Sequence, residues 1–144
     1  PTVVVFYRGG WCPYCNTQLS GLAGVEERLS ELGFQIVALS PDSPQQVAAA
    51  LEESEFSYRL LSDASANAAK GFGVAFKVDE ETYQRLQGFG IDLEAASGES
   101  HRILPVPAVF ILNTEGEVVF RYYDADYRER LSEERLIEAA EGVW

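Results

Sequence analysis

The sequence predicts an α/β fold in which a central mixed sheet is flanked by helices. Two continuous apolar runs rich in β-branched residues, Thr2 to Tyr7 and Phe34 to Leu39, are typical of buried parallel strands. Helical patterns alternate with these runs, which implies right-handed crossovers between parallel neighbours. Near the end of the chain, Ala108 to Leu112 and Glu117 to Tyr123 flank Asn113-Thr114-Glu115-Gly116, a signal for a hairpin that adds an antiparallel edge.

The first two helices have clear start and stop signals. In the helix that follows Cys12, apolar residues recur at helical spacing on one face. They are Leu22, Val25, Leu29 and Leu32. Gly33 then ends this helix as a C′ residue. The second helix is expected to have Ser43 as its cap and Pro44 as its first residue, and to run to about Ser54. Its inward side chains are expected to be Val47, Ala50 and Leu51.

The middle of the chain has weaker signals. Tyr58 to Leu61 is compatible with a short strand, and Asp63 is expected to cap a small helix that runs through Lys70. Residues 75–104 form an insertion before the hairpin. Within it, Asp79 to Gln87 is compatible with one helix, whereas residues 88–104 have no clear pattern and are expected to be irregular. A stretch of this length without regular structure is usually functional or mobile.

The last element predicted is a helix at Glu133 to Glu141, which Ser132 is expected to cap. Glu133 and Glu134 suit the positive end of its dipole. No repeat, linker or low-complexity segment divides the sequence. We therefore expect one domain over residues 1–144.

Composition and charge exclude several classes of protein. An apolar fraction of 47% fits a folded globular chain, and no apolar run approaches the length that spans a membrane. The formal net charge of −12 argues against nucleic acid or an anionic membrane as a partner. No signal peptide is visible, so we expect a cytoplasmic protein, although the chain starts inside a strand and its native N-terminus is left open.

The stretch Arg8-Gly9-Gly10-Trp11-Cys12-Pro13-Tyr14-Cys15 holds the only two cysteines. It lies where the first strand passes into the first helix, so both sulfurs face one side of the first helical turn. The partial positive charge of a helix N-terminus favours a thiolate over a thiol, and thiolates attack disulfides and peroxides. We therefore expect redox chemistry at Cys12 and Cys15.

Other interpretations of these residues carry less weight. Cys12, Cys15 and His101 supply at most three soft ligands, against the four of a structural zinc site, so no metal is expected. His101 stands alone and is expected to be a solvent-exposed loop residue. The tyrosine-rich stretch Tyr122 to Tyr127 reads as a strand end and a loop.

The order of elements, with C-x-x-C after the first strand and Pro107 before the hairpin, resembles the thioredoxin-like fold. Further segments resemble the AhpC/TSA redoxin family, the peroxiredoxin-like branch of this superfamily. They are Phe6-Tyr7, Ser40-Pro41-Asp42-Ser43-Pro44, Leu60-Leu61-Ser62-Asp63, and Pro105-Val106-Pro107-Ala108-Val109-Phe110-Ile111-Leu112-Asn113 with Gly116. The resemblance covers most of the chain and leaves residues 75–104 outside.

The sequence departs from both parent patterns. The peroxiredoxin pattern Pro-x-x-x-Thr-x-x-Cys falls on Arg8, Cys12 and Cys15, so the proline is an arginine and the threonine a second cysteine. The arginine that peroxiredoxins carry before the hairpin strand would fall near Pro107, which instead matches the cis-proline of thioredoxins. Thioredoxins also place a buried aspartate where this chain has Phe6. The chain thus resembles a peroxiredoxin frame that carries a thioredoxin-type or glutaredoxin-type C-P-Y-C.

The resemblance implies three functions. The first is a thiol–disulfide oxidoreductase with an antioxidant or redox-homeostasis role, in which Cys12 at the exposed helix start is the nucleophile and Cys15 resolves the mixed disulfide. Its partner polypeptide would contact Trp11, Tyr14, Val106 and Pro107. The second is a thiol peroxidase in which Cys15 attacks the peroxide, Cys12 resolves the sulfenic acid and Arg8 helps to lower a thiol pKa. The third is a non-catalytic module that senses redox state.

The resemblance also implies the partners. No cofactor is expected, because electrons would come from a thiol donor, the thioredoxin or glutathione system. The substrate would be a protein disulfide or a peroxide. The reductant would be a partner protein or glutathione, and a dimer is possible.

Overall fold

The computed structural model describes residues 1–54 and 56–144. The strands are β1 (Thr2–Phe6), β2 (Gln35–Ser40), β3 (Arg59–Ser62), β4 (Ala75–Lys77), β5 (Ile103–Pro105), β6 (Ala108–Leu112) and β7 (Val118–Tyr123). The helices are α1 (Pro13–Glu31), α2 (Pro44–Glu53), α3 (Asn67–Gly71), α4 (Glu80–Gly88), α5 (Leu93–Ser97) and α6 (Glu133–Glu141).

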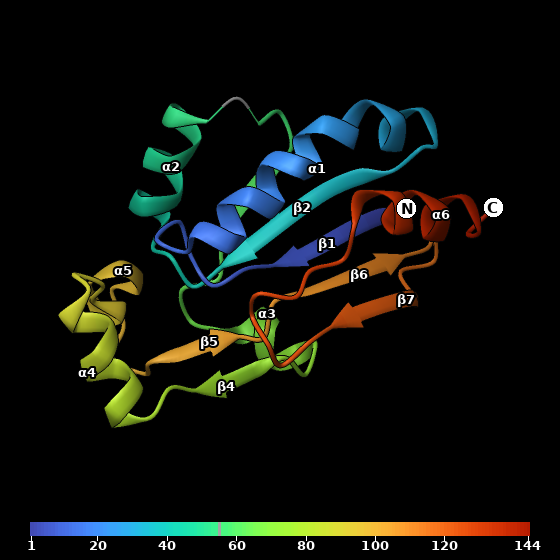
Figure 1. Cartoon of the computed structure of the whole chain (residues 1–144). Coiled ribbons are helices and arrows are strands. Elements are labelled where there is room, and N and C mark those ends of the chain that lie inside the picture. The colour runs from blue at the N-terminus through green and yellow to red at the C-terminus, as the bar shows by residue number, and fades with distance from the viewer. Residues whose placement is uncertain (55) are drawn as a thin grey trace.

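Five strands form the central mixed sheet, in the order β3-β2-β1-β6-β7 (Figure 1). Strand β1 pairs in parallel with β2 through Val4 and Val37, and β2 pairs in parallel with β3. On its other side β1 pairs antiparallel with β6, whose hairpin partner β7 forms the edge. The predicted α/β class, the parallel core and the antiparallel hairpin are therefore confirmed.

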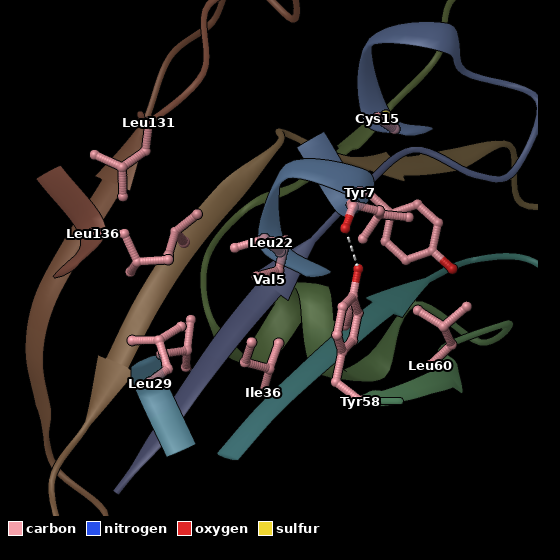
Figure 2. Packing of buried hydrophobic residues seen from close by; sticks show 14 of the residues in the cluster. Val5, Tyr7, Cys15, Leu22, Leu29, Ile36, Tyr58, Leu60, Leu131 and Leu136 are labelled. Carbon is pink, nitrogen blue, oxygen red and sulfur yellow. Dashed lines mark hydrogen bonds between the residues drawn. The ribbon is translucent and has the colours of Figure 1, made fainter. Parts of the chain in front are cut away.

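Alternate residues of β1 supply two cores, one on each face of the sheet. Val3 and Val5 pack with side chains of α1, α2 and α6, as Figure 2 shows for Leu22, Leu29 and Leu136. Val4 and Phe6 point to the opposite face. There the ring of Phe6 lies 5.2 Å from the ring of Phe72, which follows α3. A strand covered on both faces must be apolar throughout, which accounts for the unbroken run in the sequence.

The predicted helix boundaries are largely confirmed. The side chains of Ser43 and Ser132 accept hydrogen bonds from the first turns of α2 and α6, as N-cap residues do. Gly33 takes a φ of +90° just after α1, the left-handed conformation that favours glycine at a helix end. The expectation for Leu51 is wrong, because its side chain is exposed.

Residues 88–104 are not irregular, contrary to the expectation. Helix α5 and strand β5 lie in this stretch, and β5 pairs antiparallel with β4 through Phe76 and Leu104. Elements this short carry little periodicity in their own sequence, so pairing across the insertion decides their structure.

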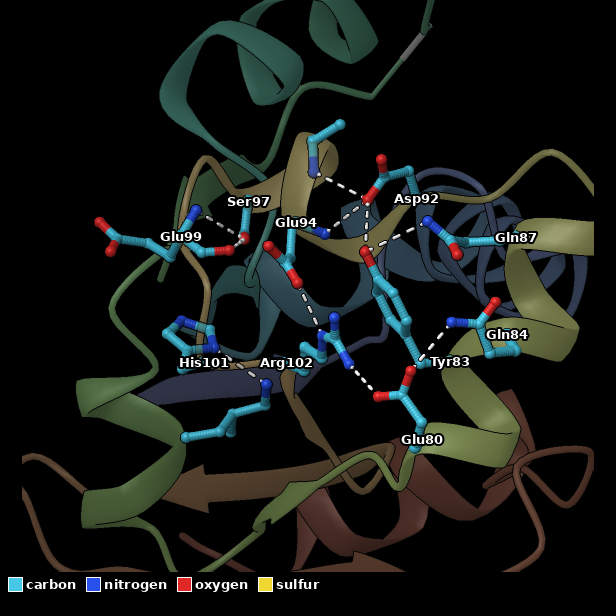
Figure 3. A network of polar contacts seen from close by, with 12 residues as sticks. Glu80, Tyr83, Gln84, Gln87, Asp92, Glu94, Ser97, Glu99, His101 and Arg102 are labelled. Atoms are coloured by element: carbon cyan, nitrogen blue, oxygen red, sulfur yellow. Dashed lines mark hydrogen bonds and ion pairs between the residues drawn. The ribbon is translucent and has the colours of Figure 1, made fainter.

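A polar network fastens α4 to α5 within the insertion (Figure 3). The guanidinium of Arg102 donates to the carboxylates of Glu80 and Glu94 and lies 3.5 Å from the ring centroid of Tyr83. The hydroxyl of Tyr83 donates to Asp92, which also caps α5. Arg102 and Tyr83 thus connect the two helices of the insertion.

His101 is not the exposed loop residue that the sequence suggested. Its Nε2 lies 2.6 Å from the carbonyl oxygen of Ala64, and its Nδ1 accepts from the backbone N–H of Ile103. The side chain is half-buried and ties the insertion to the segment before α3. Among the described residues, no helix has both the length and the apolar character that crossing a membrane requires.

Candidate active site

Cys12 and Cys15 lie where the loop after β1 passes into α1, as expected. Cys12 is the N-cap residue of α1, and its Sγ accepts from the backbone N–H of Cys15 at 3.3 Å. Pro13 opens the helix, at a position where the missing N–H costs no hydrogen bond. Both cysteines are buried, with Cys12 only 1% exposed and Cys15 fully covered. The expectation that Cys12 stands exposed at the helix start is therefore wrong.

Two donors surround the Sγ of Cys15. The backbone N–H of Arg8 donates to it at 3.4 Å from the loop after β1. The guanidinium of Arg130 reaches the same sulfur at 3.4 Å and the Sγ of Cys12 at 4.0 Å. Arg130 comes from the segment between β7 and α6. A second nitrogen of its guanidinium donates to the side-chain oxygen of Gln18 in α1. The pair of sulfurs therefore sits under a fixed positive charge that can stabilise an anion.

Aromatic and cationic side chains cover the cysteines. The guanidinium of Arg8 lies 5.0 Å from the ring centroid of Trp11 and 4.5 Å from that of Tyr127. The ring of Tyr127 also contacts the ring of Tyr14 edge to face at 5.6 Å. Tyr14 is 46% exposed and is the outermost member of this cover. The segment from β7 to α6 thus closes over the dithiol through Tyr127 and Arg130.

The reduced pair holds its charge on one sulfur. The pKa of Cys12 is lowered to about 6, and the largest cause is the hydrogen bond from the Cys15 thiol. Burial opposes this shift, whereas the backbone N–H of Cys15 and the charges of Arg8 and Arg130 add to it. The same shared hydrogen bond, followed by burial, raises the pKa of Cys15. At neutral pH the pair therefore carries one thiolate, on Cys12, and one thiol, on Cys15.

A buried carboxylate supports the loop that carries the cysteines. Asp42 follows β2 and accepts the backbone N–H of Gly10 at 2.8 Å. Gly9 has a φ of +154°, and a Cβ at that position would lie 2.3 Å from Nε1 of Trp11, so the tight loop requires glycine there. Burial raises the pKa of Asp42 from its ordinary value.

The four residues expected to contact a partner polypeptide do not all lie together. Trp11 and Tyr14 belong to the cover of the dithiol. Val106 packs with the core on the opposite face of the sheet, and its N–H donates to Val74. Pro107 is buried next to Ala108, which pairs with Phe6 at the sheet end from which the cysteine loop leaves. The described residues contain no cis peptide bond, so the expected cis-proline at Pro107 is wrong.

Sequence reasoning missed three residues of this site, namely Arg130, Tyr127 and Asp42. Arg130 lies 115 positions from Cys15 in a segment without periodicity, and no local signal points to it. Tyr127 belongs to the tyrosine-rich stretch whose pattern predicts only a strand end and a loop. Asp42 lies in a turn motif, and nothing in that motif predicts a contact with the cysteine loop. Among the described residues, no group of His, Cys, Asp and Glu is arranged to hold a metal ion.

The sequence pattern of the AhpC/TSA family matches residues 1–121 of the chain. The chain belongs to the AhpC/TSA family. A curated member with a similar sequence is the putative peroxiredoxin Bcp of Haemophilus influenzae, which is 36% identical over 72 residues. That segment is 50% of this chain and 46% of the relative, so the match spans about half the length of each.

Solved structures share the fold over nearly the whole length of the chain. The AhpC of Enterococcus faecalis superposes with a TM-score of 0.71 at 23% identity, over 99% of this chain and 75% of its own. Peroxiredoxin Q of Xanthomonas campestris gives a TM-score of 0.74 at 17% identity, over 98% of this chain and 77% of its own. These likenesses confirm the predicted thioredoxin-like fold.

Proposed function

We propose that the protein is a thiol-dependent peroxidase that reduces a small hydroperoxide at the Cys12–Cys15 pair. The observation that carries this proposal is the burial of both sulfurs beneath the guanidinium of Arg130. A hydroperoxide is small enough to reach a covered sulfur, whereas a protein disulfide has to bring a bulky polypeptide against it. The peroxiredoxin names of the curated relatives support the same choice.

The proposed reaction begins from the Cys12 thiolate and the Cys15 thiol. The proton moves from Cys15 to Cys12, and the new thiolate forms beside its two donors, the guanidinium of Arg130 and the N–H of Arg8. The Cys15 sulfur attacks the terminal oxygen of the hydroperoxide, the O–O bond breaks, and the leaving alkoxide takes the proton back from Cys12. Cys15 is now a sulfenic acid, and Cys12 is again a thiolate.

The second step closes the disulfide. The Cys12 thiolate attacks the Cys15 sulfur, and the departing hydroxide takes one proton from solvent to form water. The two sulfurs lose two electrons, and the hydroperoxide becomes an alcohol and water. An external thiol donor then returns the pair to the dithiol, and no cofactor is required. The donor is proposed to be a protein of the thioredoxin type or glutathione.

A second function deserves a test because of the low pKa of Cys12. A thiolate at the N-terminus of a helix is also the nucleophile of a thiol–disulfide oxidoreductase, with Cys15 as the resolving thiol. In that case the segment around Tyr127 and Arg130 has to move before a polypeptide reaches Cys12. In the proposed peroxide reduction Cys15 attacks first, whereas in disulfide exchange Cys12 attacks first.

Stopped-flow fluorescence of single-cysteine variants separates the two functions. A Trp144→Phe background leaves Trp11, next to the dithiol, as the only tryptophan. The reduced protein, Cys12→Ser and Cys15→Ser are each mixed with hydrogen peroxide and with an oxidised dithiol. A peroxide reaction that survives in Cys12→Ser and is lost in Cys15→Ser supports the peroxidase. Slow peroxide oxidation together with fast disulfide exchange that requires Cys12 overturns it in favour of the oxidoreductase.

A further inference from the structure

Three open hollows that share lining residues follow one another along helix α1 and past the dithiol loop. The first, of about 450 Å³, lies between α1 and α2. It shares Gly10, Ala50 and Glu53 with a second hollow of about 470 Å³ that extends to α5. It shares Ala23 with a third, of about 430 Å³, along the second half of α1. We call the three together the α1–α2 groove.

One face of α1 lines this groove over most of the length of the helix. From Asn16 through Leu19, Ala23 and Glu27 to Glu31, lining residues recur every three or four positions. At the rise of an α-helix this face is about 22 Å long. An extended polypeptide of about seven residues has the same length. The shape therefore suits a linear segment of a partner protein better than a compact small molecule.

The middle of the groove is apolar. Leu19 and Leu60 belong to the core of the domain, and Ala23, Ala50 and Phe56 pack against that core from the groove side. Such a surface can bury alternate side chains of an extended segment.

The charges of the groove are all of one sign. Six carboxylates line it, and the described lining residues include no lysine, arginine or histidine. The six are Glu26, Glu27, Glu31, Asp42, Glu53 and Asp92. Among the described residues only Glu31 has an ion-pair partner, Arg28. The groove thus holds an uncompensated negative charge.

Asp42 gives the groove a buried anchor for a cation. Its side chain is only 6% exposed, lines the groove, and accepts a hydrogen bond from the backbone N–H of Gly10. No arginine or lysine of the described chain pairs with it. A carboxylate that has lost water without gaining a cation interacts strongly with a positive group brought beside it.

We propose that the α1–α2 groove binds an extended segment of a partner protein in which basic side chains alternate with apolar ones. The apolar side chains lie on the partly buried Ala23, Ala50 and Phe56, and the basic ones meet the carboxylates along the rim, with one directed at Asp42. The groove includes Gly10 and Trp11, so the bound segment ends next to the dithiol. This proposal does not depend on whether the pair reduces peroxides or disulfides.

A binding assay with designed peptides tests the proposal. A fluorescent peptide of about nine residues that alternates lysine with leucine is titrated with the full chain, and its anisotropy is followed. A second peptide replaces lysine with glutamate, and a third replaces leucine with serine. We expect the first alone to bind well, and its binding to weaken as NaCl rises from about 20 mM to about 150 mM.

Two pairs of matched variants locate the binding. The triple variant E26Q/E27Q/E53Q removes three groove charges, and E115Q/E134Q/E138Q removes three exposed charges outside the groove. We expect the first triple to weaken binding at least about tenfold and the second by less than about twofold. Ala50→Trp fills the groove, whereas Ala48→Trp places the same ring on the exposed side of α2. Only Ala50→Trp should abolish binding.

Three outcomes overturn the proposal. If both triple variants weaken binding equally, the peptide responds to net charge alone. If the serine-containing peptide binds as well as the leucine-containing one, the apolar floor has no role. If Ala50→Trp leaves binding unchanged, the peptide lies elsewhere. Because the readout is binding, a failure here leaves the peroxidase test unaffected.

Discussion

At the scale of single residues, Arg130 adds a positive charge beside the dithiol. Its guanidinium approaches both sulfurs from the segment between β7 and α6, at a position that no sequence pattern indicated. The proline and threonine positions of the peroxiredoxin pattern hold Arg8 and Cys12 in this chain. Because an arginine replaces the proline, position 8 has a backbone N–H, which donates to the Sγ of Cys15. The side chain of Arg8 packs on Trp11 and Tyr127. Arg8 and Arg130 thus give the sulfurs a positively charged surrounding.

Removal of the guanidinium should slow the attack on peroxide. Hydrogen bonds to a charged group contribute about 1.5–3 kcal/mol, so Arg130→Ala should lower the rate of peroxide oxidation about 10- to 100-fold. Arg130→Lys should restore part of that rate, because it keeps the charge without the planar guanidinium. Stopped-flow oxidation at neutral pH gives these rates. Arg128→Ala is the control, since Arg128 pairs with Asp126 and not with a sulfur; an equal loss in both variants would contradict the assigned role.

The thiolate should form well below the ordinary cysteine range. When the reduced protein is titrated with base, the absorbance of the thiolate band should increase by the amount expected for one thiolate. The midpoint of this increase should lie near pH 6, the pKa of Cys12. The second thiolate should not appear until well above pH 9, because the pKa of Cys15 is raised. In Arg130→Ala the first midpoint should move up, since a stabilising cation is lost.

The lowered pKa of Cys12 should also make the free energy of unfolding depend on pH. The unfolded chain releases thiol protons near pH 8.5, whereas the folded pair has already lost one near pH 6. Between these values the folded state binds fewer protons, so the free energy of unfolding of the reduced protein should increase with pH. Urea unfolding at about pH 6 and about pH 8 measures this. Cys12→Ser should flatten the dependence, and an unchanged slope in that variant would show that another group causes it.

At the scale of elements, the insertion packs against the dithiol loop at Trp11. Trp11 packs against the cluster formed by Val78, Tyr83, Leu93 and Leu104, and also against the main core. The insertion has no long helix or strand of its own. Its order depends on the β4–β5 pairing and on the contacts of Arg102.

Loss of Arg102 should loosen the insertion and leave the sheet intact. Arg102→Leu removes the bonds to Glu80 and Glu94 and the contact with the ring of Tyr83. We expect faster amide hydrogen exchange in α4 and α5 and unchanged protection in β1 and β2, because local openings follow local contacts. Mass spectrometry of exchanged peptides checks this. Arg85→Leu, which breaks only an exposed pair within α4, should leave all rates unchanged; a uniform increase across the chain in Arg102→Leu would contradict a local role.

At the scale of the whole molecule, one sheet divides two cores, and the dithiol belongs to the core under α1. Cys12 and Cys15 pack in the same cluster as Leu29 of α1 and Leu136 of α6. Helix α1 therefore carries both cysteines at its start and part of the main core along its length. The stability of the fold and the position of the site depend on the same helix.

A cavity in this core should destabilise the whole chain. Leu29 is fully buried, so Leu29→Ala should lower the free energy of unfolding by about 2–5 kcal/mol. Urea unfolding should still show one transition with an unchanged slope, since the surface exposed on unfolding changes little. Val119→Ala on the exposed edge strand should cost less than about 1 kcal/mol. A similar loss in both variants would mean that Leu29 does not lie in the main core.

Much of the fold could be predicted because its signals are local. The strand runs, the single apolar face of α1, the caps Ser43 and Ser132 and the glycine after α1 each depend on a few neighbouring residues. The same holds for the position of the dithiol at a strand-to-helix junction. The order of elements then limits the sheet to a parallel core with an antiparallel hairpin, because crossovers have one handedness.

The sequence by itself therefore determined the α/β class, the strand directions and the place of the two cysteines at the start of α1. Only the tertiary structure decided that both sulfurs are buried, that Arg130 lies beside them, that Tyr127 packs on Arg8 and Tyr14, and that Asp42 supports their loop. It also decided the pairing of β4 with β5 and the trans peptide bond at Pro107. The reason is physical. Periodicity and capping depend on residues within a few positions, whereas burial and charge at a site depend on side chains that packing brings together from distant parts of the chain.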